Sequence, residues 1–396
     1  MLRRQTTIHR EGWYYLLIVV VVFGGALFKE VNLLLILAGM LLGPVLLNWQ
    51  AVGTNLRGLC LERKLPRGLS AGDWLSVSLR LSNARRRLGA WGVVVEEQIR
   101  RVTAAGGDNP GGPLLSPDVL FPYVPAGETR KGAYRGRLLE RGRYRFGPVR
   151  LSTRFPFGLF SRTITMGESE TLLVLPRLGR LTDGWAGRRL EAIAGVDRRS
   201  FRPGLEGDFY GVREWRGGDG RRLIHWRSSA RLGKLVVRQF AQPRSRDVAV
   251  VLDLWQPERP TADQLANVEL AVSFAATVLS DVCRRGGSSV YLALGNPTPQ
   301  CLGAPASSGL LQSLMEQLAT IEAASGGTLP TLLASVLPQI AADAEIVLVS
   351  TRPTDLADGV RFAALWSNPV LRDRAQRIRY IDTSSEQLAE LFQAEA

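Results

Sequence analysis

Residues 12–28 read GWYYLLIVVVVFGGALF and residues 31–49 read VNLLLILAGMLLGPVLLNW, two apolar runs separated by the charged pair Lys29 and Glu30. A helix needs about 17–25 apolar residues to cross the hydrocarbon core of a bilayer, and both runs meet that length. Neither run has the polar face that a buried hairpin of a soluble protein would show. We therefore predict two membrane-spanning helices, 12–28 and 31–49, within an anchor that occupies residues 1–56.

Aromatic residues mark one end of this hairpin: Trp13 begins the first helix and Trp49 ends the second, as expected at a membrane–water interface. Seven basic residues flank the same end: Arg3, Arg4, Arg10, Arg57, Arg63, Lys64 and Arg67. The positive-inside rule then predicts a multi-pass protein of the cell inner membrane whose soluble domains face the cytoplasm. A cleaved signal peptide is the alternative, but a second apolar run follows Phe28 at once and no convincing cleavage site precedes it.

The net charge of +14 is unevenly distributed along the chain. Residues 57–176 hold 20 basic and 10 acidic side chains, residues 177–246 hold 17 and 7, and residues 247–396 hold 9 and 17. Basic residues next to a membrane are attracted to anionic lipid by ~1 kcal/mol each, so membrane lipid is an expected partner. The basic and acidic domains can also dock on each other. The odd number of widely spaced cysteines favours neither a disulfide framework nor a zinc site.

Residues 57–178 have the pattern of a small β-sandwich-like domain. Period-two alternation or short apolar runs, broken by Gly and Pro clusters, predict strands near 74–82, 93–95, 141–151 and 171–175. We interpret the arginines that alternate with Tyr144, Phe146 and Val149 as the solvent face of a strand. A surface for lipid headgroups is the alternative interpretation.

Residues 247–396 alternate between strand and helix patterns. We expect strands at 247–254, 289–294, 345–350 and 377–381, and helices at 262–285, 309–321, 332–341 and 385–394. Such alternation predicts an α/β domain with a parallel sheet and helices on both faces. Ligands of these sheets bind at the carboxyl ends of the strands, which here are Asp253 and the pair Ser350 and Thr351.

Residues 179–246 contain an Arg/Trp-rich motif, and its stretch 202–238 reads RPGLEGDFYGVREWRGGDGRRLIHWRSSARLGKLVVR. This motif closely resembles the core of the bacterial family called domain of unknown function 58. The matching residues are Gly207, Phe209, Gly211, Val212, Arg213, Glu214, Trp215, Gly218, Asp219, Arg222, Ile224, His225, Trp226, Ala230, Arg231, Gly233 and Lys234. The runs 141–145 and FPFGLF (155–160) resemble the family's motif before the core, which usually has Asp where this chain has Phe155.

The resemblance implies a membrane-anchored protein whose last domain is similar to a von Willebrand factor A domain. Genes of such proteins often lie beside those of MoxR-type AAA+ ATPases and other von Willebrand A proteins. A protein partner of either kind is therefore expected, together with a role in assembling or maturing other complexes. The resemblance implies no reaction.

The motif offers nine candidate binding residues: Arg213, Trp215, Asp219, Arg221, Arg222, His225, Trp226, Arg227 and Arg231. They could form a buried ion-pair and stacking network that fixes the segment in place. They could instead form an exposed surface for an acidic protein partner or a phosphate. We expect Arg213 and Trp226 to be buried and Arg221 and Arg227 to be exposed, with neighbours Arg221 and Arg222 in different environments. Arginine-rich composition also suits nucleic acid, which we do not expect as the partner.

Catalytic and cofactor motifs are few. A metal-dependent von Willebrand A site needs Asp-x-Ser-x-Ser to supply oxygen ligands, but here Trp255 and Pro257 follow Asp253 in place of the serines. We treat Asp253 as a degenerate metal site and expect no metal and no cofactor. The chain has two histidines, His9 and His225, and no nucleophile–base pair is evident, so we do not expect an enzyme.

The sequence thus favours a membrane-tethered protein-interaction or assembly-factor module. One alternative is a membrane-bound enzyme that uses His225 with Asp219 or Asp253. Another is a binder of anionic lipid or nucleic acid through the arginine-rich motif.

Overall fold

The computed structural model describes residues 3–29, 32–102, 115–185, 202–204, 208–217, 219–242, 247–295, 298–327, 329–385 and 387–394. The residues that link the two predicted membrane helices, and the motif positions Gly207 and Gly218, lie outside these ranges. The contacts between residues divide the chain into two compact units, Met1–Leu175 and Pro176–Ala396. The domain boundaries predicted at 57–178, 179–246 and 247–396 stay predictions.

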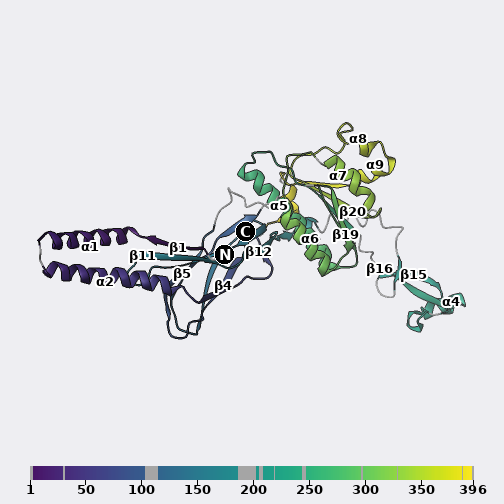
Figure 1. Ribbon diagram of the computed structural model, residues 1–396. Helices are drawn as coiled ribbons and strands as arrows, with labels where there is room; N and C mark the ends of the chain where they lie inside the picture. The colour runs from purple at the N-terminus through teal and green to yellow at the C-terminus, as the bar shows by residue number, and fades with distance from the viewer. Residues whose placement is uncertain are drawn as a thin grey trace. The chain divides into compact units, whose positions relative to one another are not determined.

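The first unit begins with the predicted pair of apolar helices, which is confirmed (Figure 1). α1 covers Arg10–Lys29 and α2 covers Asn32–Asn55, so the second helix runs six residues past Trp49. The Tyr15 hydroxyl donates to the Leu41 carbonyl at 3.1 Å and ties the two helices together. Both helices are long and apolar enough to span a membrane, and most of each is uncovered by the rest of the chain. A third helix, α5 (Ala262–Arg285), also meets the length and composition, but two-thirds of it is buried inside the second unit.

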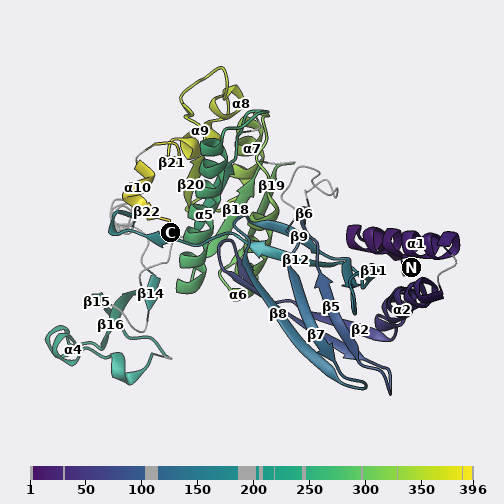
Figure 2. The same ribbon diagram turned by 90° about the vertical axis from the view of Figure 1, so that its left-hand side faces the viewer.

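The β-rich region of the first unit contains three sheets around one core, as Figure 2 shows. The five-stranded sheet runs in the order β1 (Arg3–Ile8), β11 (Phe160–Met166), β10 (Val149–Thr153), β5 (Ala90–Glu96) and β7 (Asp118–Val124). The four-stranded sheet runs β3 (Leu69–Ser70), β12 (Glu170–Leu175), β9 (Gly142–Phe146) and β6 (Ile99–Val102). The three-stranded sheet runs β2 (Leu59–Lys64), β4 (Trp74–Asn83) and β8 (Thr129–Arg137). Alternate residues of β4 are buried, as its period-two pattern predicted.

Three features of this unit differ from the sequence interpretation. The stretch 141–151 is two strands in different sheets rather than one, because the chain turns at Gly147 and Pro148 between β9 and β10. Arg143 on β9 is exposed as expected, but Arg141 is only 2 % exposed. Residues 3–8 were interpreted only as a charged flank, yet they form β1 and pair antiparallel with β11.

The second unit contains the predicted α/β domain with a mixed five-stranded sheet. Its order is β19 (Gln300–Pro305), β18 (Ser289–Leu294), β17 (Val248–Asp253), β20 (Glu345–Ser350) and β21 (Arg379–Asp382). Four strands are parallel, whereas β19, which the sequence analysis missed, is antiparallel to β18. All six residues of β17 and of β20 are buried, as expected for strands that are covered on both faces.

Helices cover both faces of this sheet. α5 packs against β17 and against α6 (Ser308–Thr320), which also contacts β19. The buried side of α7 (Leu329–Val336) packs on Ala249 and Val251 from the other face. The predicted helix at 332–341 begins earlier, ends at Val336 and continues as the 3-10 turn η2 (Leu337–Gln339), because Pro338 cannot continue an α-helix. Two short helices follow β20: α8 (Ala363–Trp366) and α9 (Pro369–Ala375).

The end of the chain also differs from its predicted helix at 385–394. Of the described residues in this range, those of α10 (Gln387–Leu391) are helical, and the chain then forms the short strand β22 (Phe392–Gln393). β22 pairs antiparallel with β13 (Arg180–Leu181), which ties the start of the second unit to its end.

Candidate functional site

The nine predicted site residues lie on one antiparallel hairpin. β15 (Asp208–Glu214) pairs with β16 (Val236–Gln242), and the connection between them holds η1 (Arg221–Leu223) and α4 (Trp226–Leu232). β14 (Arg202–Gly204) adds a third strand along β16. We call the described residues of 208–242 the Arg/Trp hairpin. Its sequence contains eight basic and three acidic side chains, so it is strongly positive.

A very small core holds the Arg/Trp hairpin together. Ile224, Val236 and Val237 are buried, and Ile224 forms a backbone bridge with Val237. The Ser229 hydroxyl accepts the Val236 N–H at 3.0 Å and is itself buried. α4 is therefore fastened to β16 through its one buried residue, and its remaining side chains point away from this core.

An ion pair fixes the turn after β15. The Arg213 guanidinium donates two hydrogen bonds of 2.7 Å to the two carboxylate oxygens of Asp219, the bidentate geometry that arginine favours. Asp219 also accepts the Arg216 N–H at 2.8 Å. The hydrogen bond from Arg213, followed by that from the Arg216 N–H, lowers the pKa of Asp219, and the same carboxylate raises the pKa of Arg213. Both side chains are partly buried, so this pair is part of the scaffold.

His225 is the N-cap of α4. Its Nδ1 lies 2.7 Å from the Ser228 hydroxyl and accepts the Ser228 N–H at 3.3 Å, while its backbone N–H donates to the Val236 carbonyl. A side-chain acceptor at this position satisfies an N–H group that the helix itself cannot pair. Asp219 bonds to Arg213 and Arg216, and Asp253 contacts Ser350 and Arg352. The carboxylates of the enzyme alternative therefore already have other partners.

The Arg/Trp hairpin carries exposed apolar and exposed basic side chains. Its exposed large apolar residues are Val212, Trp215, Trp226, Leu232 and Leu235. Its exposed basic residues include Arg216, Arg221, Arg222, Arg227 and Arg231. Apolar and aromatic side chains interleaved with arginine are typical of protein-binding surfaces.

Two expectations about burial are wrong. Trp226 is 65 % exposed, because the seven-residue helix α4 buries only one of its own side chains, the small Ser229. Arg221 and Arg222 share one exposed environment, because η1 buries none of its side chains. Arg227 is exposed as expected.

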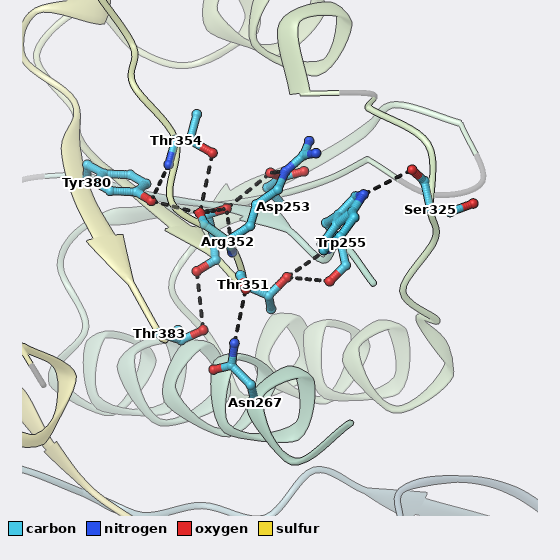
Figure 3. A network of polar contacts seen from close by, with 10 residues as sticks. Asp253, Trp255, Asn267, Ser325, Thr351, Arg352, Thr354, Tyr380 and Thr383 are labelled. Atoms are coloured by element: carbon cyan, nitrogen blue, oxygen red, sulfur yellow. Dashed lines mark hydrogen bonds and ion pairs between the residues drawn. The ribbon is translucent and has the colours of Figure 1, made fainter. Parts of the chain in front are cut away.

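A second polar cluster lies where β17 and β20 end, and Figure 3 shows it. Asp253 and Ser350 are paired in register, and the Ser350 hydroxyl lies 3.1 Å from the Asp253 carboxylate. The Thr351 hydroxyl accepts the Trp255 N–H at 2.8 Å and donates to the Trp255 carbonyl at 2.7 Å. Strand pairing thus brings together the residues that the sequence analysis placed at strand ends.

Arg352 provides the cation of this cluster. Its Nε lies 3.5 Å from the Asp253 carboxylate, and its guanidinium lies over the Trp255 ring, 5.3 Å from the ring centre. The Tyr380 hydroxyl donates to the Arg352 carbonyl at 2.9 Å, and burial raises the pKa of Tyr380. The sequence analysis missed Arg352. The available signal was a charged residue two positions after the end of a strand, β20, that is mainly apolar.

These residues do not fit a divalent cation. Asp253 is the only carboxylate among them, it is 4 % exposed, and it already faces the Arg352 guanidinium. Trp255 presents its ring to Arg352 and its backbone to Thr351. Hard cations need several oxygen ligands, and one occupied carboxylate does not supply them. The prediction that the chain binds no metal stays a prediction.

Comparison with known proteins extends the resemblance found in the motif. A protein-family model described as "Protein of unknown function DUF58" matches residues 211–352, from the Arg/Trp hairpin through Arg352. A Bacillus subtilis (strain 168) protein named "Uncharacterized protein YeaD" is 24% identical over 187 residues, which is 45% of this chain and 42% of that protein. The chain therefore matches less than half of that relative's length. Neither name states a partner or a reaction.

Solved structures resemble only limited parts of the chain. The sporulation control protein Spo0M from Bacillus subtilis is similar with a TM-score of 0.21 and 13% identity, over 38% of this chain and 58% of that chain. The CARDB domain of PF1109 from Pyrococcus furiosus has a TM-score of 0.20 and 12% identity, over 30% of this chain and 94% of that chain. Similarities this low carry no conclusion about function.

Proposed function

We propose that this protein is a membrane-tethered interaction module whose Arg/Trp hairpin binds an acidic protein partner. The observation that carries the proposal is the exposure of this hairpin's side chains: Trp226 is 65 % exposed, and the arginines on either side of it in the sequence, Arg222 and Arg227, are exposed as well. Large aromatic and arginine side chains dominate the binding energy of protein interfaces. Positive charge beside them attracts acidic surfaces and speeds association.

The scaffold of the hairpin supports a binding role. Arg213 and Asp219 hold the turn, and His225 caps α4. These contacts use few of the hairpin's charged groups: among its described residues, the other ion pair joins Lys234 to Glu214. The exposed arginines are thus carried on a fixed backbone, which lowers the entropy that binding must overcome.

The membrane part of the proposal rests on α1 and α2. Basic residues such as Arg57 flank the membrane helices α1 and α2 on the side of the soluble parts. In this proposal the positive-inside rule therefore makes the protein a multi-pass protein of the inner membrane, and both units face the cytoplasm. The partner is then a cytoplasmic or membrane-associated protein. The mixed α/β sheet is von Willebrand factor A-like in this proposal, and a MoxR-type AAA+ ATPase or another von Willebrand A protein is the expected partner class.

The enzyme and nucleic-acid alternatives have weaker support. An enzyme that uses His225 would need Asp219 or Asp253, and both carboxylates contact arginines instead. Nucleic acid would suit the arginines, but it does not account for the five exposed apolar side chains of the hairpin as a protein interface does. Anionic lipid would suit both kinds of side chain, and crosslinking distinguishes it from a protein partner.

Site-specific photo-crosslinking in cells tests the proposal. A photoreactive phenylalanine analogue replaces Trp226 in the full-length protein, and in the control it replaces Val360, an exposed apolar residue of the same unit. We expect a crosslink to one protein with an acidic surface from position 226 and not from position 360. Crosslinks to lipid or nucleic acid alone from position 226 would overturn the proposal in favour of the corresponding alternative.

A further inference from the structure

Five apolar side chains of the first unit form an exposed patch beside the membrane helices. Trp91 stacks with Tyr123 at 4.1 Å between ring centres and with Phe155 at 5.6 Å. Phe157, on the same loop as Phe155, is 54 % exposed, and Leu88 before β5 is also exposed. Soluble proteins rarely expose contiguous apolar surface of this kind without a binding function. We call these five residues the seating patch.

Trp91 of the seating patch is hydrogen-bonded to the C-terminal end of α2. Asn55, the last residue of α2, donates to the Trp91 carbonyl at 2.6 Å and accepts the Trp91 N–H at 2.9 Å. Arg85, which follows β4, donates to the carbonyls of Thr54 and Asn55 at 2.9 and 3.1 Å. A guanidinium at these carbonyls satisfies the helix C-terminus and complements its dipole. The first unit therefore fixes β5 against the end of α2.

The loop that carries Phe155 and Phe157 also packs on both helices. The His9 N–H donates to the Leu159 carbonyl at 3.2 Å, and the Phe160 N–H donates to Asn48 at 3.0 Å. Gly12 makes the close approach possible, because a side-chain carbon there would lie 2.3 Å from the Leu159 carbonyl oxygen. Both views place β11, which follows this loop, beside the start of α1 and the end of α2 (Figures 1 and 2).

The contacts set the depth of the loop relative to the bilayer. Leu159 and Phe160 pack with Val52, Tyr15 and Val45, which belong to the helices. Phe160 also meets Trp49 at 5.4 Å between ring centres. Trp13 and Trp49 mark the interface if the helices span the membrane. Asn55 lies six residues beyond Trp49, which is about 9 Å along the axis, a few ångströms more than the thickness of a headgroup layer of about 6 Å.

Exposed basic residues lie close to the patch residues in the sequence. Arg57, Arg86, Arg87 and Arg154 are exposed near α2, Leu88 and Phe155 in the sequence. A layer that accepts aromatic rings together with arginines is the interfacial region of an anionic bilayer. We propose that the seating patch inserts into this layer and holds the β-rich region against the membrane. The proposal rests on the membrane anchor and is independent of the acidic partner.

Fluorescent probes in nanodiscs test the proposal. In full-length protein whose Cys60, Cys283 and Cys301 are replaced by alanine, single Phe157→Cys, Leu139→Cys and Val20→Cys variants are labelled with an environment-sensitive probe. Discs hold one protein each and contain phosphatidylglycerol and doxyl-labelled lipid. Leu139 is 78 % exposed and follows β8 at the far end of β4 from α2, about 30 Å along the strand. Val20 is an exposed residue of α1 and reports on the anchor itself.

We expect lipid quenching of the probes at positions 157 and 20 and none at position 139. Quenching at position 20 without quenching at position 157 would overturn the seating patch and leave the anchor intact. Absence of quenching at both positions would overturn the patch together with the anchor. A blue shift at position 157 that appears only in discs with two proteins would assign the patch to a second copy of the chain and also overturn the proposal.

Discussion

Asn55 and Trp91 are joined by two hydrogen bonds, one from the Asn55 amide to the Trp91 carbonyl at 2.6 Å and one from the Trp91 N–H to Asn55 Oδ1 at 2.9 Å. The Asn55 amide also lies 2.9 Å from the Thr153 hydroxyl. One side chain at the end of α2 thus connects the membrane hairpin to two neighbouring strands, β5 and β10. The β-rich region is attached to its anchor by specific contacts and not by a linker alone.

Replacing Asn55 should therefore weaken this attachment. Asn55→Ala removes the partner of the Trp91 N–H, whereas the Trp91 carbonyl keeps the Thr153 hydroxyl at 3.1 Å. A group that loses its partner costs about 1–3 kcal/mol. We expect a clearly lower melting temperature of the purified full-length protein by intrinsic fluorescence. Gln50→Ala, an exposed residue of the same helix, is the control and should change stability by less than about 0.5 kcal/mol. Equal melting of both variants would contradict the structural role of Asn55.

The buried group of Arg63, Glu97 and Tyr134 predicts an alkaline dependence of stability. The Tyr134 hydroxyl donates to Glu97, which also pairs with Arg63, and both charged side chains are almost fully buried. Burial, followed by the hydrogen bond to Glu97, raises the pKa of Tyr134. The unfolded phenol titrates near about pH 10. Because the folded state retains the proton to higher pH, this contribution to stability is complete below about pH 10 and is lost as pH rises above it.

Tyr134→Phe should accordingly flatten the loss of stability above pH 10. At neutral pH it should cost about 1–3 kcal/mol, because a buried Glu97 oxygen loses its donor. Denaturant unfolding at pH 8 and at pH 10.5 measures both effects. The exposed Tyr123, changed to Phe, is the matched control and should retain the slope of the unchanged protein. A Tyr134→Phe slope equal to that of the unchanged protein would refute the account.

The pair of Arg352 and Asp253 should be essential to the α/β sheet. Arg352→Met leaves the buried Asp253 carboxylate without its cation, a change that costs about 3–5 kcal/mol. Adding Asp253→Asn should recover much of that loss, because the second change removes the unpaired charge. Arg377→Met breaks an exposed pair and should cost about 0–1 kcal/mol. Additive losses in the double variant, measured by chemical denaturation, would show that the two groups do not interact.

The bidentate pair of Arg213 and Asp219 should order the turn after β15. Lysine cannot form two parallel bonds to one carboxylate, so Arg213→Lys should speed amide hydrogen exchange at residues 215–223. Arg238→Lys, an exposed change on β16, should leave exchange in that turn unaltered. Unchanged exchange in both variants would mean that backbone contacts alone hold the turn.

The fold was predictable where one local pattern decides the structure. The apolar runs, the alternation of β4 and the buried strands β17 and β20 each bury residues at a period that the sequence displays. β1 and β19 were missed, because each forms by pairing with another strand, β11 and β18 respectively, and not from a local pattern of its own. The stretch 141–151 was read as one strand, because its alternation continues across the turn at Gly147.

The exposure of the candidate residues was not predictable from the sequence, and their binding role stays a prediction. The motif contains Arg213 and Asp219, and the structure brings them together in a bidentate pair. Trp226 was expected to be buried in an ion-pair and stacking network, but α4 buries only Ser229. Arg352 was missed because its partner, Asp253, lies 99 positions away and approaches it only through the pairing of β17 with β20.

The affinity of the crosslinked partner for the Trp226→Ala variant tests the central claim most directly. Loss of a central aromatic residue from an interface typically costs about 2 kcal/mol or more, so the Kd measured in nanodiscs should rise about thirtyfold. Val360→Ala should leave Kd unchanged, and added salt should slow association because the hairpin is basic. An unchanged Kd for Trp226→Ala, with salt-independent association, would contradict the claim that the exposed side chains of the Arg/Trp hairpin are where this protein binds its partner.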